Sequence, residues 1–218
     1  HLAVFAEGEG EPVAALVSAG DCKITLSQTI AGDPQGHVSF EGVQAKAHGA
    51  VTDAASGNLL MLMGAAVRSM QMAGALQAVL DMTVAYAKDR SAFGRPIRKF
   101  QAIQHSLARL AGEVAAAAAV SGSAADAIKH AESFDDAVFL EAASAKIRVG
   151  EAAGEGAAIA HQAFGAIGFT QEHILHRYVR RQWAWRDQFG NESEWAEQLG
   201  RHVAGAGADE LWPMLAAR

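Results

Sequence analysis

The sequence predicts a mostly α-helical protein, an antiparallel four-helix bundle with extra short helices, preceded by a partial antiparallel β-domain. Three observations favour this architecture. Half of the 218 residues are apolar, enough for a substantial core. Residues 1–52 hold short β-prone runs between turn signals, whereas from Asp53 onward apolar residues recur every three or four positions. We therefore divide the chain into a partial β-domain, residues 1–52, and a helical bundle domain, residues 53–218.

The β-domain is predicted from four short runs of strand-forming residues, with glycine or Asp33-Pro34 between them. A sheet this small is marginal alone, because one of its faces must be buried. We expect it to complete a larger β-domain or to pack on the helices. The expected strands are residues 2–5, 13–17, 22–26 and 37–40.

The bundle is predicted to begin with two long helices. The first runs from Asp53 to near Arg90. The second begins at Pro96, because proline fits the first turn of a helix, where its missing N–H removes no hydrogen bond. A turn is expected at residues 126–133. Long helices joined by short connections favour an antiparallel bundle.

Three further helices are expected in the second half of the chain. Residues 135–164 form an alanine-rich helix with a narrow face suited to close packing. Thr170 is the expected N-cap of the next helix, which reaches Phe189 and stops at Gly190. Residues 192–204 form the last.

Charge and cysteine content exclude several classes of protein. The formal charge is −6 and the charged residues are interspersed, so no basic surface for nucleic acid or anionic membrane is expected. Cys22 is the only cysteine, which excludes an internal disulfide and a cysteine-rich zinc site. The apolar stretches are shorter than the roughly 18 residues of a membrane span. We expect a cytoplasmic protein, and the first residue, His1, suggests a fragment.

The most informative segment joins the first two long helices and reads YAKDRSAFGRPIRKFQAIQH, residues 86–105. Its residue types alone are also compatible with a plain helix hairpin whose turn is made by Gly94. The full string resembles the acyl-CoA dehydrogenase signature, in which R-x-x-F-G-x-P-I is followed by F-Q and by a histidine four residues after the glutamine. In this chain the signature begins at Arg90.

A second segment resembles the same family independently. Residues 162–169 resemble its Q-x-x-G-G-x-G-F stretch, with Ala166 in place of the second glycine of the pair. The following TQEHILHRYVRR, residues 170–181, resembles a run found in a subset of the family. The two segments lie in the expected order and at the expected separation, so the resemblance covers essentially the whole chain.

These residues suit a dinucleotide. Arg90 can hold a pyrophosphate through two parallel N–H donors, and Phe93 offers an aromatic face beside it. The glutamines can donate and accept hydrogen bonds, and glycines let backbone amides approach closely. The resemblance implies FAD bound at a subunit interface, an acyl-CoA substrate and an electron-acceptor flavoprotein. The predicted FAD-binding set is Arg90, Phe93, Gln101, Gln162, Gly165, Ala166 and Gly168.

The family's catalytic glutamate is missing. Desaturation of an acyl-CoA requires a carboxylate to remove the α-proton, because the flavin accepts only the hydride. The two positions that carry this glutamate in the family correspond to Phe189 and Gly64. Asp187 and Glu192 lie near the first of these positions and are the candidate substitutes for the base, although the interpretation as solvated charges at helix ends is favoured for both.

The resemblance therefore implies a subunit without the base, paired with a homologous base-bearing subunit as in heteromeric acyl-CoA dehydrogenases of steroid side-chain breakdown. The alternative assembly is a homo-oligomer. The alternative function is that of a helical scaffold with the same fold but no cofactor. His173 and His176 lack a third ligand, so no metal site is predicted. Four tryptophans are expected in the core or an interface rather than in an acyl pocket: Trp183, Trp185, Trp195 and Trp212.

Overall fold

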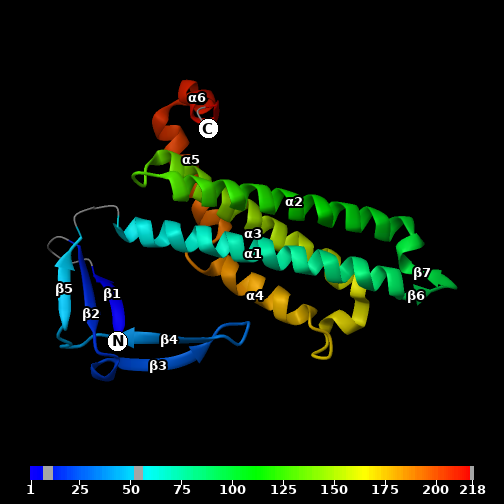
Figure 1. Ribbon diagram of the computed structural model, residues 1–218, viewed down its shortest axis with the longest axis horizontal. Coiled ribbons are helices and arrows are strands. Elements are labelled where there is room, and N and C mark those ends of the chain that lie inside the picture. The colour runs from blue at the N-terminus through cyan, green and yellow to red at the C-terminus, as the bar shows by residue number, and fades with distance from the viewer. Residues whose placement is uncertain (7–11, 52–55, 217–218) are drawn as a thin grey trace. The chain divides into compact units, whose positions relative to one another are not determined.

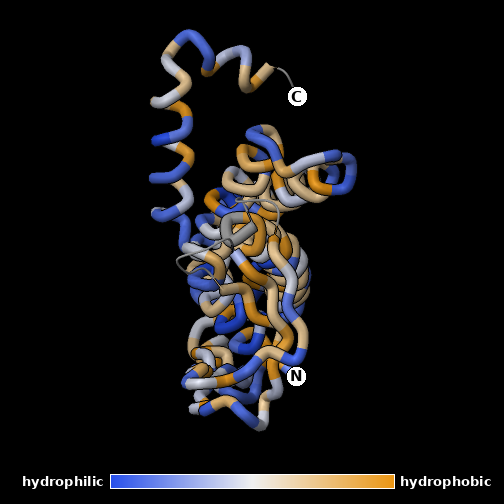
Figure 2. The backbone as a smooth tube through the Cα atoms, turned by 90° about the vertical axis from the view of Figure 1, so that its left-hand side faces the viewer, coloured by the Kyte–Doolittle hydropathy of each residue, from blue (hydrophilic) through white to orange (hydrophobic). Residues whose placement is uncertain are grey.

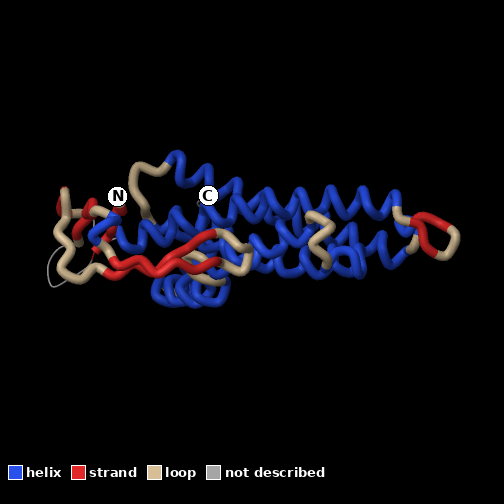
Figure 3. Tube along the Cα trace, turned by 90° about the horizontal axis from the view of Figure 1, so that it is seen from below, coloured by secondary structure: helices blue, strands red, loops and turns tan. Residues whose placement is uncertain are grey.

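The structure, a computed structural model, describes residues 1–6, 12–51 and 56–216 and divides into two compact units, His1–Met61 and Leu62–Arg218. The first unit contains strands β1 to β5, and the second is largely helical (Figures 1 and 3). This arrangement confirms the predicted fold class.

The strand unit contains two small antiparallel sheets. One has the order β1-β2-β5, with Leu2 opposite Val17 at one end, and the other pairs β3 with β4. All six residues of β3 are exposed, and only the last two residues of β4, Val38 and Ser39, are partly buried, so this hairpin contributes no buried residue to a core. The prediction omitted β5, whose sequence AHGA has no β-branched residue to indicate a strand. The strands are β1 Leu2–Ala6, β2 Val13–Val17, β3 Lys23–Gln28, β4 Pro34–Ser39 and β5 Ala47–Ala50.

The helical unit is built on long helices that lie alongside one another (Figure 1). In its last two helices hydrophilic and hydrophobic residues alternate, as the C-terminal stretch in Figure 2 shows. The sixth helix has no buried residue. A small hairpin separates the first two helices, and each of its strands has two residues: β6 Ser91–Ala92 and β7 Arg95–Pro96. The helices are α1 Ser56–Asp89, α2 Gln101–His130, α3 Asp136–Phe164, α4 Leu175–Asp187, α5 Glu192–Ala206 and α6 Leu211–Ala216.

Three predicted boundaries are wrong. Pro96 belongs to the hairpin, and α2 begins only at Gln101, after a 3₁₀ turn and an extended Phe100. The turn expected at 126–133 starts later, because α2 continues to His130. Thr170 does not cap α4, since its hydroxyl donates to the carbonyl of Ile167.

The core of the bundle follows the predicted alanine-rich face of α3. Leu76 from α1, Leu110 from α2 and Val149 from α3 itself are fully buried in one cluster. A Cβ at Gly156 would lie 2.7 Å from Leu76 Cδ2, so the absence of a side chain there sets how closely α3 approaches its neighbours.

Among the residues that the structure describes, one helical stretch, residues 59–89 of α1, is long and apolar enough to cross a membrane by length and composition alone. Of its most apolar window, 44% is buried inside the structure, and Met72 and Leu76 of this helix belong to the bundle core. A core helix of a bundle has the same properties.

Candidate functional site

The first signature segment forms a tight hairpin at the end of α1. Phe93 and Gly94 both have positive φ, 52° and 77°, the backbone shape of the two-residue turn that suits a twisted hairpin. The Ile97 amide donates to the Arg90 carbonyl at 2.8 Å and closes the loop. Phe93 is 95% exposed, and its ring is arranged roughly perpendicular to that of Phe100, with the two ring centroids 6.2 Å apart. Arg90 and Gln101 are also exposed, so the predicted residues here face outward.

The second segment ends α3. Gln162 is exposed on its last turn, and Gly165 follows with φ 65° and its amide bonded to the His161 carbonyl. Ala166 is exposed, so the methyl group that replaces the family's glycine hydrogen points into no crowded space. Gly168 is different. A Cβ there would lie 2.9 Å from Phe164 Cβ, so this glycine serves close packing.

The two segments lie at the same end of the helical unit. Tyr86, one turn before Arg90, stacks on Phe164 with ring centroids 4.3 Å apart, and its hydroxyl donates to the Phe164 carbonyl at 3.3 Å. Figure 1 shows the hairpin β6–β7 and the C-terminal end of α3 at this end. Exposed amide, guanidinium and aromatic groups from segments about 70 residues apart are therefore presented together, a donor set that fits a dinucleotide.

The two positions expected to carry a catalytic glutamate are in direct contact. The ring of Phe189 lies on the bare backbone of Gly64, where a Cβ would be 2.2 Å from Phe189 Cδ1 and 2.3 Å from its Cγ. Phe189 has a left-handed φ of 57°, and its carbonyl accepts a hydrogen bond from Trp195 Nε1 at 2.8 Å. A phenyl ring thus occupies the space next to α1 where a side chain at position 64 would begin.

Gly64→Ala is expected to destabilise the protein by about 1–3 kcal/mol, because the added methyl group overlaps the Phe189 ring and forces it to move. The free energy of unfolding is measured by urea denaturation. The matched control is Gly74→Ala on the same helix, where a Cβ meets nothing within 4 Å and alanine should stabilise by up to about 1 kcal/mol.

A double-mutant cycle makes the contact specific. In a Phe189→Ala background the penalty of Gly64→Ala should largely disappear, because the overlapping ring is gone. Equal penalties in both backgrounds would show that Phe189 is not what Gly64 accommodates.

The two substitute carboxylates occupy different surroundings. Asp187 is exposed at the end of α4. Glu192 bonds Arg186 Nε at 2.6 Å and lies so close to Gly150 that a Cβ there would be 1.9 Å from Glu192 Oε1. This ion pair holds α4, α5 and α3 together, as expected of a structural carboxylate.

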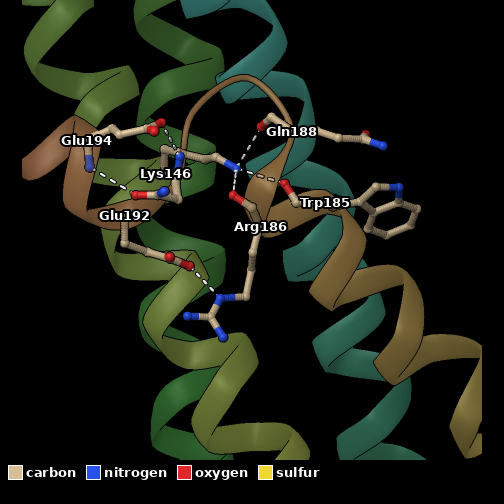
Figure 4. A network of polar contacts seen from close by, with 7 residues as sticks. Lys146, Trp185, Arg186, Gln188, Glu192 and Glu194 are labelled. Atoms are coloured by element: carbon tan, nitrogen blue, oxygen red, sulfur yellow. Dashed lines mark hydrogen bonds and ion pairs between the residues drawn. The ribbon is translucent and has the colours of Figure 1, made fainter. Parts of the chain in front are cut away.

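Sequence reasoning missed Lys146. This lysine of α3 is fully buried, and its Nζ donates to the carbonyls of Trp185, Arg186 and Gln188 at 2.7, 2.8 and 3.0 Å (Figure 4). Burial lowers its pKa from 10.5 to about 8. A signal was present, because Lys146 lies four residues after Ala142, on the face predicted to be buried.

The histidines make local contacts. The Leu175 amide donates to His173 Nδ1 at 3.1 Å, and His176 Nδ1 lies 2.7 Å from the His173 carbonyl. Within the described residues no group of three metal-ligating side chains is present. His161 stacks on Phe169 at 4.3 Å, and burial lowers the pKa of its imidazole.

The sequence matches a family model described as acyl-CoA dehydrogenase, C-terminal domain, over residues 56–192. Among curated relatives, acyl-CoA dehydrogenase IpdE2 of Mycobacterium tuberculosis is 40% identical over 108 residues, which is 50% of this chain and 31% of that protein. Acyl-CoA dehydrogenase FadE34 of the same organism is 34% identical over 145 residues, 66% of this chain and 20% of that protein. The chain thus spans about a third or less of the length of these relatives.

Two of the solved structures with a similar fold are named for a pair of proteins. A chain of the ChsE4-ChsE5 complex from Mycobacterium tuberculosis superposes with a TM-score of 0.84 at 27% identity, covering 93% of this chain and 55% of that one. A chain of the Tcur3481-Tcur3483 steroid ACAD gives a TM-score of 0.82 at 26% identity, with 94% and 55% coverage.

Proposed function

We propose a function for this chain, which belongs to the acyl-CoA dehydrogenase family. It is part of a subunit that helps to hold FAD in a heteromeric acyl-CoA dehydrogenase but does not supply the catalytic base. The contact between Phe189 and Gly64 carries this proposal. Both family positions for the base lack a carboxylate, and the Phe189 ring fills the space where a side chain at position 64 would begin.

The residues at the hairpin end of the bundle are the proposed FAD contacts. When bound, FAD supplies the acceptor for the hydride that leaves the β-carbon of the acyl group. Arg90 would bind the pyrophosphate, with the Phe93 ring beside it. Gln101 and Gln162 would bind adenine, ribose or phosphate edges, and the amides around Gly165 would approach the cofactor closely.

The α-proton of the thioester has to be taken by a carboxylate from elsewhere, for which we propose a homologous partner subunit. Asp187 is exposed and Glu192 is paired with Arg186, so neither is arranged as a buried, unpaired carboxylate that could act as the base. The paired assemblies named for the two similar solved structures support a heteromer, and the name of one of them suggests a steroid acyl group.

The experiment is to measure FAD per chain, from the visible flavin spectrum, in the full-length protein purified with the native partner that it brings along. About one FAD per pair of unlike subunits is the expected result. One FAD per chain in a homo-oligomer that desaturates acyl-CoA would overturn the proposal and direct attention to Asp187 and Glu192. A protein without flavin would favour the scaffold.

A further inference from the structure

A side chain from α3 bonds the carbonyl end of α4. A helix leaves its last carbonyls without intrahelical partners. Here the buried Nζ of Lys146 donates to two of them, the carbonyls of Trp185 and Arg186, and to the carbonyl of the C-cap residue Gln188; each bond is 3.0 Å or shorter (Figure 4). A positive charge at this end of a helix is also favoured by the helix dipole.

These bonds fix the start of a short connection, residues 187–191, that we call the α4–α5 corner. The chain reverses there through two left-handed residues, Phe189 at φ 57° and Gly190 at φ 83°. The far side is held by a capping box, in which Asn191 and Glu194 bond each other's backbone amides at 3.0 Å. Lys146 is the group that anchors the near side.

We propose that Lys146 is the positioning residue of the α4–α5 corner, holding the end of α4 so that the Phe189 ring rests on Gly64. It acts through the backbone and touches no reacting atom. The inference does not require the proposed function, because the contacts exist whether or not the assembled protein binds flavin. Its importance comes from the corner itself, which carries one of the family's two positions for the base.

The charges around Lys146 make the anchor testable by pH. Burial lowers the pKa of Lys146 to about 8. The charges of Glu192 on α5 and Asp187 on α4 oppose this shift, and those of Arg186 on α4 and Arg68 on α1 add to it. The pKa of Lys146, about 8, lies within the range from pH 7 to 9.5, so this amine loses its proton there. A neutral amine has two N–H donors for three carbonyls, so the hydrogen bonds of the corner must rearrange as pH rises.

The Trp195 indole N–H reports the corner directly, because it donates to the Phe189 carbonyl at 2.8 Å. The experiment follows the tryptophan indole resonances of the ¹⁵N-labelled protein from pH 7 to 9.5, with Trp195 assigned by its loss in Trp195→Phe. The expected result is a shift of the Trp195 indole proton with a midpoint near pH 8. Lys146→Met should abolish this titration.

The matched control is Lys129→Met, which removes an exposed lysine from the last turn of α2 and should keep the titration unchanged. A Trp195 resonance that is flat across this pH range in the unaltered protein would overturn the inference, and that measurement needs no variant to fold. A Lys146→Met protein that still titrates like the unaltered one would overturn it as well. Neither result bears on the FAD content that tests the proposed function.

Discussion

Replacement of Trp195 by alanine is expected to lower the free energy of unfolding by about 3–5 kcal/mol. Its side chain is only 2% exposed and lies among residues of α1 and α3, including Leu62 and Val138. Removing the indole leaves a large cavity where three helices meet, and it also removes the donor to the Phe189 carbonyl. Urea denaturation followed by circular dichroism measures the change.

Two variants separate the contributions. Trp212→Ala removes a tryptophan that is 75% exposed on α6 and should change stability by no more than about 0.5 kcal/mol. Trp195→Phe keeps most of the packing and should lose chiefly the hydrogen bond, about 1 kcal/mol. Similar losses for Trp195→Ala and Trp212→Ala would contradict the buried position of Trp195.

Arg90→Ala is expected to weaken FAD binding by the assembled protein about 100-fold, or ~2.7 kcal/mol. The reason is that a guanidinium group can donate two parallel charge-assisted hydrogen bonds to a pyrophosphate, and alanine offers none. The measurement is titration of the flavin-free complex with FAD, followed by flavin fluorescence. The FAD affinity of Arg90→Lys should lie between those of the unaltered complex and of Arg90→Ala, because lysine keeps the positive charge but not the two parallel N–H donors.

The control is Arg201→Ala, which removes an exposed arginine of α5 that pairs with Glu197, one turn away on the same helix. Its FAD affinity should match the unaltered complex. If Arg90→Ala binds FAD as tightly as Arg201→Ala, the assignment of the hairpin to the pyrophosphate is wrong.

The sequence predicted the helices well where apolar periodicity decides the structure and poorly where local hydrogen bonds decide it. Helix α3 was placed to within a residue, and Asp135 caps it through the amides of Ala137 and Val138. Thr170 has a residue type typical of an N-cap, but its hydroxyl donates to the carbonyl of Ile167. Several irregular residues then precede α4, which begins at Leu175. Residue type alone does not reveal which partner a hydroxyl will choose.

The candidate site was predictable in its residues but not in its contacts. The motifs identified Arg90 and Gln162, although their binding of FAD stays a prediction. The motif positions also named Gly64 and Phe189, but nothing in their separation of 125 positions indicates that one packs on the other. Lys146 was missed because a lysine within an alanine-rich helix suggests solvent exposure, and only its three carbonyl partners explain its burial.

The contact between Gly64 and Phe189 also restricts how this sequence can change. A glutamate introduced at position 64 would start from a Cβ that overlaps the phenyl ring, so that substitution is unfavourable until position 189 has first become small. A glutamate introduced at position 189 would replace a ring that packs with Leu62, Ala65 and Trp195, and its carboxylate would have to turn out of that cluster. The order of substitutions therefore matters, and epistasis between these two positions hinders the recovery of a base in a single step.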